Sequence, residues 1–192
     1  MANEQKRVLG IVGSPRQGGN TEILVDEILE GARDAGAHAE KVLLSDLAIG
    51  ACQACFNCRQ GGDCGCVQTD DMEEILAKMR SSDVWVLGTP VYWWGPSAQM
   101  KAFVDRWFSV ATGPERKEMF EGRKVILAIP MGDSDPATGR HVVGMFTDAL
   151  NYVKANLVAS VLAPGAYDPG EVRNYPEVLE RARNAGRDAV RS

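Results

Sequence analysis

VLGIVGSPRQGGNT, residues 8–21, joins a short apolar segment to a glycine-rich turn that leads directly into a helical pattern. The segment Val8–Val12 is almost continuously apolar, as expected of a strand that is buried on both faces of a sheet. The helix predicted at Thr21–Ala35 carries apolar residues four positions apart, with Asn20 as its expected N-cap. A buried strand that passes through glycines into a helix is the first unit of a parallel α/β sheet.

The same alternation of strand and helix continues along the chain. Further strands are predicted at Lys41–Leu44, Val84–Leu87, Val125–Ile129 and Leu157–Leu162. They are also nearly continuously apolar, so burial on both faces is expected for every strand. Further helices are predicted at Asp71–Met79, Ser97–Phe108 and Arg140–Ala155, and a charged C-terminal helix follows the irregular stretch Pro164–Pro176. Right-handed crossovers then give a three-layer α/β/α sandwich, and five parallel strands favour the order 2-1-3-4-5 of flavodoxin-like folds. In that order a ligand binds at the carboxyl ends of strands 1 and 3, where the winding reverses.

Length and charge limit the classes of function. The 192 residues suit one domain, and the formal net charge of −5 comes with no basic stripe, which argues against nucleic acid as the main ligand. The longest apolar run, Val125–Met131, is too short to span a bilayer, and the polar start Met1–Arg7 leads into no signal-type segment. We therefore expect a single domain, residues 1–192, in the cytoplasm and without a membrane or nucleic-acid partner.

The loop after the first strand, Gly13–Thr21, has the parts of a phosphate site. Glycines allow close backbone approach, a helix N-terminus supplies unpaired N–H donors, and hydroxyl and amide side chains add further hydrogen bonds. The loop has neither the Gly-Lys-Ser/Thr ending of a Walker loop nor the G-x-G-x-x-G of a dinucleotide site. A terminal monophosphate fits best, and an ordinary glycine-rich connection is the alternative.

The loop after the third strand, Gly88–Ser97, places three adjacent aromatic residues, Tyr92, Trp93 and Trp94, between glycines and prolines. Loops normally face water, so this much aromatic surface predicts a flat partner such as a planar heteroaromatic ring. Packing against a neighbouring subunit is the alternative, and it does not exclude the first. A third loop, Pro130–Pro136, follows the fourth strand on the same edge and either reaches the ligand or forms a turn and helix cap.

Taken together, GSPRxGGNT, TPVYWxxPS and the downstream KAFVDRW resemble the NADPH-dependent FMN reductase group of flavodoxin-fold proteins. The resemblance covers Val8 to about Val161 and implies FMN, NAD(P)H as co-substrate, and a homodimer or homotetramer whose neighbouring subunit completes the flavin pocket. It implies that the phosphate is held around Ser14, Arg16, Gly19, Asn20 and Thr21. It also implies that the ring lies along Pro90, Val91, Tyr92, Trp93 and Gly95, with Gly132 from the third loop. Asp105 and Arg106 are expected to form a structural ion pair or an interface contact.

All five cysteines lie within residues 52–66, in the pattern Cys52-x2-Cys55-x2-Cys58-x5-Cys64-x-Cys66. Three thiolates at two-residue gaps with a fourth further on follow the logic of a [4Fe–4S] site. The pattern resembles the iron–sulfur flavoprotein branch of the same family, with either Cys64 or Cys66 as the fourth ligand. Zinc bound by four thiolates, and thiols without any metal, remain alternatives.

These features predict an oxidoreductase that passes electrons from NAD(P)H through FMN to a quinone, a flavin or a redox protein, with a [4Fe–4S] cluster as a further route. Hydride transfer to a flavin needs no side-chain acid or base, so we expect no catalytic side chain. Backbone N–H groups at residues 91–93 and 131–132 are expected to bind the ring edge. An FMN-binding electron carrier or regulator without pyridine-nucleotide turnover is the main alternative, and a colourless phosphatase or nucleotide switch is a third reading. His38 and His141 are expected to be surface or packing residues.

Overall fold

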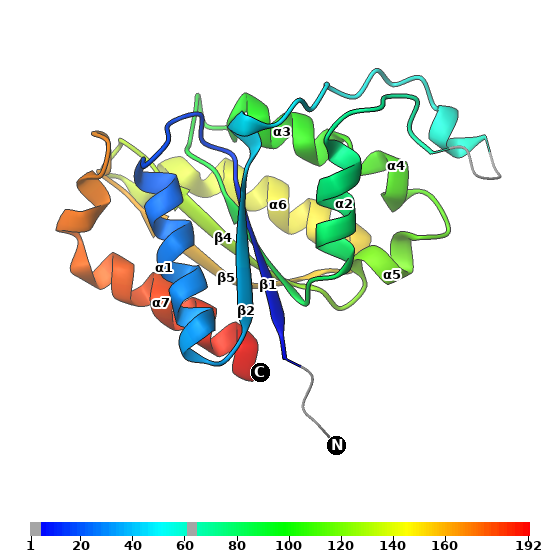
Figure 1. Cartoon of the computed structure of the whole chain (residues 1–192). Coiled ribbons are helices and arrows are strands. Elements are labelled where there is room, and N and C mark those ends of the chain that lie inside the picture. Colours follow the sequence, from blue (N-terminus) through cyan, green and yellow to red (C-terminus); the bar gives the residue numbers. More distant parts are fainter. Residues whose placement is uncertain (1–4, 61–64) are drawn as a thin grey trace.

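A computed structural model describes residues 5–60 and 65–192, and its centre is a five-stranded parallel sheet in the order β2-β1-β3-β4-β5 (Figure 1). The strands are β1 (Arg7–Val12), β2 (His38–Leu43), β3 (Val84–Gly88), β4 (Lys124–Pro130) and β5 (Asn156–Ala163). The predicted strand order is confirmed. Val12 of β1 pairs with Leu43 on one side and Gly88 on the other, so three strands end level and release their loops at one edge.

Helices cover both faces of the sheet (Figure 1). One face carries α1 (Asn20–Asp34) and α7 (Pro176–Arg191). The other carries α2 (Met72–Arg80), α3 (Ala98–Asp105), α4 (Phe108–Ala111), α5 (Arg116–Phe120) and α6 (Arg140–Val153). Short 3-10 helices η1 (Leu44–Asp46), η2 (Asn57–Arg59), η3 (Pro136–Gly139) and η4 (Glu171–Asn174) lie in the connections. None of the helices in the described ranges is long and apolar enough to cross a membrane.

Alternating side chains of the central strands pack into two separate hydrophobic cores, one on each face of the sheet. In β3, Trp85 and Leu87 face the core under α2–α6, whereas Val84 and Val86 face the core under α1 and α7. Only β1, β3 and β4 are buried almost throughout. The expectation that every strand is buried on both faces is wrong for β2 and β5, because these edge strands have a neighbouring strand on one side only and keep many half-exposed residues.

Helices α1 and α7 approach each other through two glycines. A Cβ atom on Gly31 would lie 1.8 Å from the Arg183 carbonyl oxygen, and one on Gly186 would lie 1.8 Å from the Ile28 carbonyl oxygen. Backbone therefore packs directly on backbone at this crossing, and no side chain fits between the two helices. Since α1 begins in the loop after β1, this packing helps to fix where that loop lies.

Two local expectations are corrected by the structure. Gly19, not Asn20, is the N-cap of α1, and Asn20 is the first helical residue. The helix predicted at Ser97–Phe108 is broken into α3 and α4, because Arg106 turns toward Asp70 while Trp107 packs against Phe103 and Phe120 in the core.

Asp105 and Arg106 of KAFVDRW, expected to form an ion pair or an interface contact, each pair with a different residue. Asp105 pairs with Lys101 at 2.5 Å on the surface, and Arg106 pairs with Asp70 at 2.5 Å in the interior. Both residues form ion pairs, but they do not pair with each other. His38 and His141 are exposed, as expected of surface residues.

Candidate functional site

The loops after β1 and β3 are joined where the winding of the sheet reverses. The Gly13 N–H donates to the Gly88 carbonyl at 2.7 Å. Ser97 caps α3 by accepting from the Met100 N–H at 3.1 Å, and its own hydroxyl donates to the Gly13 carbonyl. A Cβ atom on Gly13 would lie 2.7 Å from Met100 Cβ, so the first loop needs glycine there to pass close to α3.

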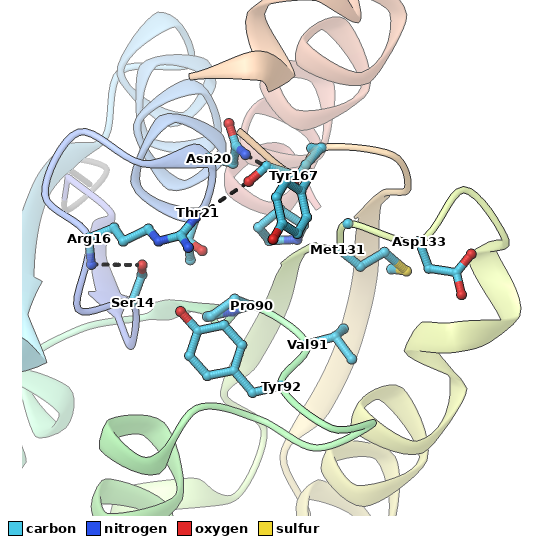
Figure 2. Close-up of a pocket in the computed structure, with 13 residues that line it drawn as sticks. Ser14, Arg16, Asn20, Thr21, Pro90, Val91, Tyr92, Met131, Asp133 and Tyr167 are labelled. Atoms are coloured by element: carbon cyan, nitrogen blue, oxygen red, sulfur yellow. Dashed lines mark hydrogen bonds between the residues drawn. The ribbon is translucent and has the colours of Figure 1, made fainter. Parts of the chain in front are cut away.

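A cavity of about 500 Å³ opens at this edge (Figure 2). Its walls come from the loops that follow β1, β3, β4 and β5, since the carboxyl ends of parallel strands lie together. The lining residues are Ser14, Arg16, Asn20, Thr21, Pro90, Val91, Tyr92, Pro130, Met131, Gly132, Asp133, Ala166 and Tyr167. Eight of the eleven cofactor-binding residues expected from the sequence are among them, whereas Gly19, Trp93 and Gly95 are not. The volume is large enough for a mononucleotide-sized ligand.

The first loop is held in shape by its own hydrogen bonds. The Arg16 N–H donates to Ser14 Oγ at 3.2 Å, and the Gly18 N–H donates to Glu22 Oε2 at 2.6 Å. Burial alone would raise the pKa of Glu22, but hydrogen bonds from Lys41 and Gly18 outweigh burial and lower it. The carboxylate therefore stays ionised and braces the loop that leads into the N-terminus of α1.

Asn20 has a different role from the expected one. Its Nδ2 donates to the Ala166 carbonyl at 3.0 Å and to the Asp168 carbonyl at 2.8 Å, and its Oδ1 accepts from the Val172 N–H at 3.1 Å. Both amide hydrogens are thus used within the protein. Asn20 therefore fixes the loop after β5 over the helix N-terminus, and its side-chain N–H groups are not free for a ligand.

The aromatic loop after β3 folds into a tight hairpin. Tyr92 and Gly95 exchange N–H to carbonyl hydrogen bonds of 2.9 and 3.0 Å, and the two residues between them, Trp93 and Trp94, adopt φ values of 49° and 60°. Left-handed backbone costs a non-glycine residue about 1 kcal/mol, so the hairpin keeps two tryptophans at a cost in stability. Tyr92 lines the cavity, while Trp93 is 92% exposed beside it.

Most of the backbone donors expected to meet a ring edge are already used. The Val91 N–H donates to the Pro130 carbonyl, the Tyr92 N–H to the Gly95 carbonyl and the Met131 N–H to the Ala163 carbonyl. This corrects the expectation for these three residues, since the same bonds build the cavity wall. Of the five groups, those of Trp93 and Gly132 have no acceptor in residues 5–60 and 65–192.

The loop after β5 supplies a wall that the sequence reasoning missed. Figure 2 shows the Tyr167 ring beside Asn20 and Met131, with Arg16 reaching toward the Tyr167 backbone. A Cβ atom on Gly132 would lie 2.6 Å from Tyr167 Cδ2, so the ring packs directly on the Gly132 backbone. The available signal was that Tyr167 follows a strand predicted to end at this same edge.

Asp133 combines the two roles considered for the third loop. Its Oδ1 accepts from the Asp135 N–H and its Oδ2 from the Thr138 hydroxyl, both at 2.9 Å, and these bonds lower the pKa of its carboxyl. Asp133 also lines the cavity. The turn chemistry therefore places an ionised side chain at the far wall from Arg16, as Figure 2 shows.

The cysteine loop leaves β2 at the same edge and extends over the α3 and α4 side of the molecule (Figure 1). Cys52, Cys55, Cys58 and Cys66 line one small cavity of about 20 Å³, together with Arg106 and Phe108 among others. Burial raises the pKa of Cys58, and the other three thiols raise it further because they lie close to it. Among the described residues no group of three or more cysteine, histidine or acidic side chains is arranged to hold a metal ion, and Cys64 lies outside those residues.

One ionisable pair at the base of this loop predicts a pH dependence. Burial tends to raise the pKa of Asp70, but hydrogen bonds from Arg106, Gly50 and Met72 lower it below its ordinary value of 3.8. The ionised carboxylate thus adds stability that is fully present above about pH 4 and is lost as the pH falls through the lowered pKa. We expect Asp70→Asn to reduce the free energy of unfolding by about 2 kcal/mol at neutral pH, and by clearly less at pH 3.

The measurement is urea unfolding of wild type and variant at the two pH values. Asp105→Asn is the matched control, because its pair with Lys101 is exposed and should contribute less than about 1 kcal/mol at either pH. A difference between wild type and Asp70→Asn that stays constant with pH would contradict the lowered pKa.

Comparison with known proteins gives three kinds of match. The sequence profile described as "NADPH-dependent FMN reductase" matches residues 6–168. An iron–sulfur flavoprotein of Methanocaldococcus jannaschii is 32% identical, over 94% of this chain and 94% of its own. One from Archaeoglobus fulgidus is also 32% identical, over 94% of this chain and 77% of its own. The solved structure of an NAD(P)H:quinone oxidoreductase from Methanothermobacter marburgensis superposes with a TM-score of 0.75, at 20% identity and 96% coverage of both chains, and supports the fold.

Proposed function

Because the chain belongs to the NADPH-dependent FMN reductase family, we propose that it binds FMN in the cavity at the carboxyl edge of the sheet and uses it to oxidise NAD(P)H. The observation that carries this proposal is the cavity itself. Four loops meet around a space of about 500 Å³, with the N-terminus of a fifteen-residue helix at one end and aromatic and proline side chains along one wall.

The phosphate end is assigned to the loop after β1. The first-turn N–H groups of α1 have no partner within the helix and carry a partial positive charge. Ser14 and Thr21 add hydroxyl groups, and Arg16, the one arginine or lysine among the lining residues, adds a full positive charge. Ser14 and Thr21 are buried and Arg16 is exposed, so a phosphate there would be held by buried donors on the inside and covered by an exposed cation on the outside.

The ring end is assigned to Pro90, Val91 and Tyr92, with Gly132 opposite. The free N–H groups of Trp93 and Gly132 suit the polar edge of a flavin, which carries carbonyl oxygens and ring nitrogens. The hairpin keeps its exposed tryptophans despite their left-handed backbone, and such strain is typical of functional sites. We infer that Trp93 and Trp94 border the open face where the nicotinamide stacks.

The chemistry of the reaction resides in the cofactor. When bound, FMN accepts a hydride from NAD(P)H and passes the electrons on to an acceptor. The protein orients the ring, excludes water from its inner face and leaves the outer face accessible. No side chain has to transfer a proton in the hydride step.

We further propose that the cysteine loop holds a [4Fe–4S] cluster. The donor types suit this group, since four thiols share one cavity with a buried arginine whose Nε has no hydrogen-bond partner among the described residues. Such a cluster transfers single electrons, so the chain would hand electrons from a two-electron donor to a one-electron acceptor such as a small redox protein. Relatives described as iron–sulfur flavoproteins support this assignment.

Steady-state oxidation of NADPH and NADH tests the proposed reaction. Protein loaded with FMN is expected to oxidise at least one of the two nucleotides well above the rate of free FMN at the same concentration. The control is the same preparation after removal of flavin by dialysis and re-addition of FMN, which should restore the rate. A rate no higher than that of free FMN, with the flavin still bound, would instead favour an electron carrier without pyridine-nucleotide turnover.

The homodimer or homotetramer expected from the resemblance stays a prediction.

A further inference from the structure

One buried guanidinium closes the base of the cysteine loop. Arg106 Nη1 donates to the Gly50 carbonyl at 3.0 Å and to Asp70 Oδ2 at 2.5 Å, and its Nη2 donates to Asp70 Oδ1 at 3.0 Å. Asp70 Oδ2 also accepts from the Gly50 N–H at 2.9 Å. Gly50 lies just before the loop and Asp70 just after it, so Arg106 ties the two ends of the segment 51–69 together.

The stem on either side of this clamp is also hydrogen-bonded. Asp71 accepts from the Ala48 N–H at 2.7 Å, and Gln68 Nε2 donates to the Ala51 carbonyl at 3.1 Å. A Cβ atom on Gly50 would lie 2.3 Å from Gln68 Oε1, so the chain segments that enter and leave the loop are in close contact. The loop is therefore held in place at its base, and the cysteines lie in the segment that this base supports.

Arg106 also faces the thiols. It lines the same small cavity as the four described cysteines. Its side chain is only 2% exposed, yet the Nε atom has no hydrogen-bond partner within residues 5–60 and 65–192. A buried guanidinium N–H without an acceptor is unfavourable, so this donor calls for an acceptor that the loaded site would supply.

Cys66 lines, together with Arg106, both this small cavity and the larger one beside it. Burial tends to lower the pKa of Arg106, but the Asp70 carboxylate and a contact with Cys66 raise it. Among the described cysteines, Cys66 is also the one closest in sequence to Asp70. It precedes Asp70 by only four residues, in the segment that leaves the loop. Fixing Asp70 therefore restricts where the Cys66 sulfur can lie.

We propose that Arg106 is a positioning residue that holds Cys66, rather than Cys64, as the fourth sulfur ligand of the cluster, with its Nε–H donating to that sulfur. The ligand set is then Cys52, Cys55, Cys58 and Cys66. The inference rests on the proposed function, because it presupposes that the loop binds an iron–sulfur cluster. Hydrogen bonds to ligand sulfurs favour the more negative, reduced form of a cluster, so Arg106 also raises its reduction potential.

The ligand assignment is tested with Cys64→Ser and Cys66→Ser, reconstituted anaerobically with ferrous iron and sulfide. Cys64→Ser is expected to take up as much iron and sulfide as wild type and to show the same absorption. Cys66→Ser is expected to lose most of the bound iron while keeping its FMN. Full iron in Cys66→Ser, or its loss in Cys64→Ser, would overturn the assignment. Wild type that takes up no iron would contradict the cluster in the proposed function, and this inference with it, whereas NAD(P)H oxidation through FMN would be untouched.

The role of Arg106 is tested with Arg106→Lys. Lysine retains a positive charge for Asp70 but has no Nε–H beside its charged end and cannot form the two-pronged contact. We expect the variant to bind FMN normally and to assemble a cluster with a more negative reduction potential and faster loss of iron in air. Arg59→Lys, an exposed arginine within the same loop, is the matched control and should leave the potential unchanged. Equal reduction potentials of the cluster in wild type and Arg106→Lys would show that Arg106 does not interact with the cluster.

Discussion

A Ser14→Asp variant is expected to lose nearly all affinity for FMN while keeping its fold. Ser14 Oγ accepts from the Arg16 N–H at 3.2 Å, and an aspartate oxygen can accept the same hydrogen bond, so the loop geometry is retained. The added carboxylate, however, lies on the wall assigned to the phosphate. Repulsion between unit charges ~4 Å apart is about 4 kcal/mol at an effective dielectric constant of ~20, which is roughly a thousandfold rise in Kd.

Ser14→Asn is the matched control for this prediction. Asparagine has nearly the same shape as aspartate and accepts the same hydrogen bond, but it carries no charge. We expect its Kd for FMN to rise less than about tenfold, because only one hydroxyl contact is lost. Both Kd values can be measured by quenching of flavin fluorescence on titration into flavin-free protein. Equal affinities of the two variants would place the phosphate away from Ser14.

Replacing Gly186 by alanine is expected to lower the free energy of unfolding by about 3 kcal/mol. The added methyl group would lie 1.8 Å from the Ile28 carbonyl oxygen, which belongs to the backbone of α1 and cannot rotate away. Helices α1 and α7 must then move apart and lose part of the core between them. Because α1 carries the phosphate end of the cavity, we also expect weaker FMN binding by the folded variant.

Gly144→Ala in α6 is the control for the helix substitution. No atom of the described residues lies within 4 Å of a Cβ atom at Gly144, so the change removes backbone freedom from the unfolded chain without a clash. We expect it to raise the free energy of unfolding by up to about 1 kcal/mol. Urea unfolding of both variants measures the difference. A Gly186→Ala variant as stable as Gly144→Ala would show that the two helices are not in direct backbone contact.

The sequence was sufficient to place the main walls of the cavity. Gly13–Thr21 and Pro90–Tyr92 follow strands whose apolar character is plain, and parallel strands bring their carboxyl ends together whatever else the chain does. The resemblance of the loop motifs then implied FMN as the cofactor. The strand order followed from the same alternation, because right-handed crossovers leave few other arrangements for five strands.

The contacts that refine the site depend on long-range packing and could not be predicted. On sequence grounds Asn20 is a candidate helix cap or phosphate ligand. Only the path of the loop after β5 shows that its side-chain amide donates to the Ala166 and Asp168 carbonyls. Arg106 lies 36 residues from Asp70, and adjacent Asp105 is a plausible partner for it on sequence grounds. Local patterns do not encode which of two neighbouring charges turns inward, since that choice depends on how Trp107 fits the core.

Calorimetric titration of the flavin-free protein with FMN and with riboflavin tests the central claim most directly. The two ligands share the ring and the ribityl chain and differ only in the phosphate. If the N-terminus of α1 with Ser14, Arg16 and Thr21 binds that phosphate, FMN should bind at least roughly a hundredfold more tightly, as expected for two charge-assisted hydrogen bonds. Equal affinities for FMN and riboflavin would contradict a phosphate site in this loop, and with it the proposed orientation of the flavin.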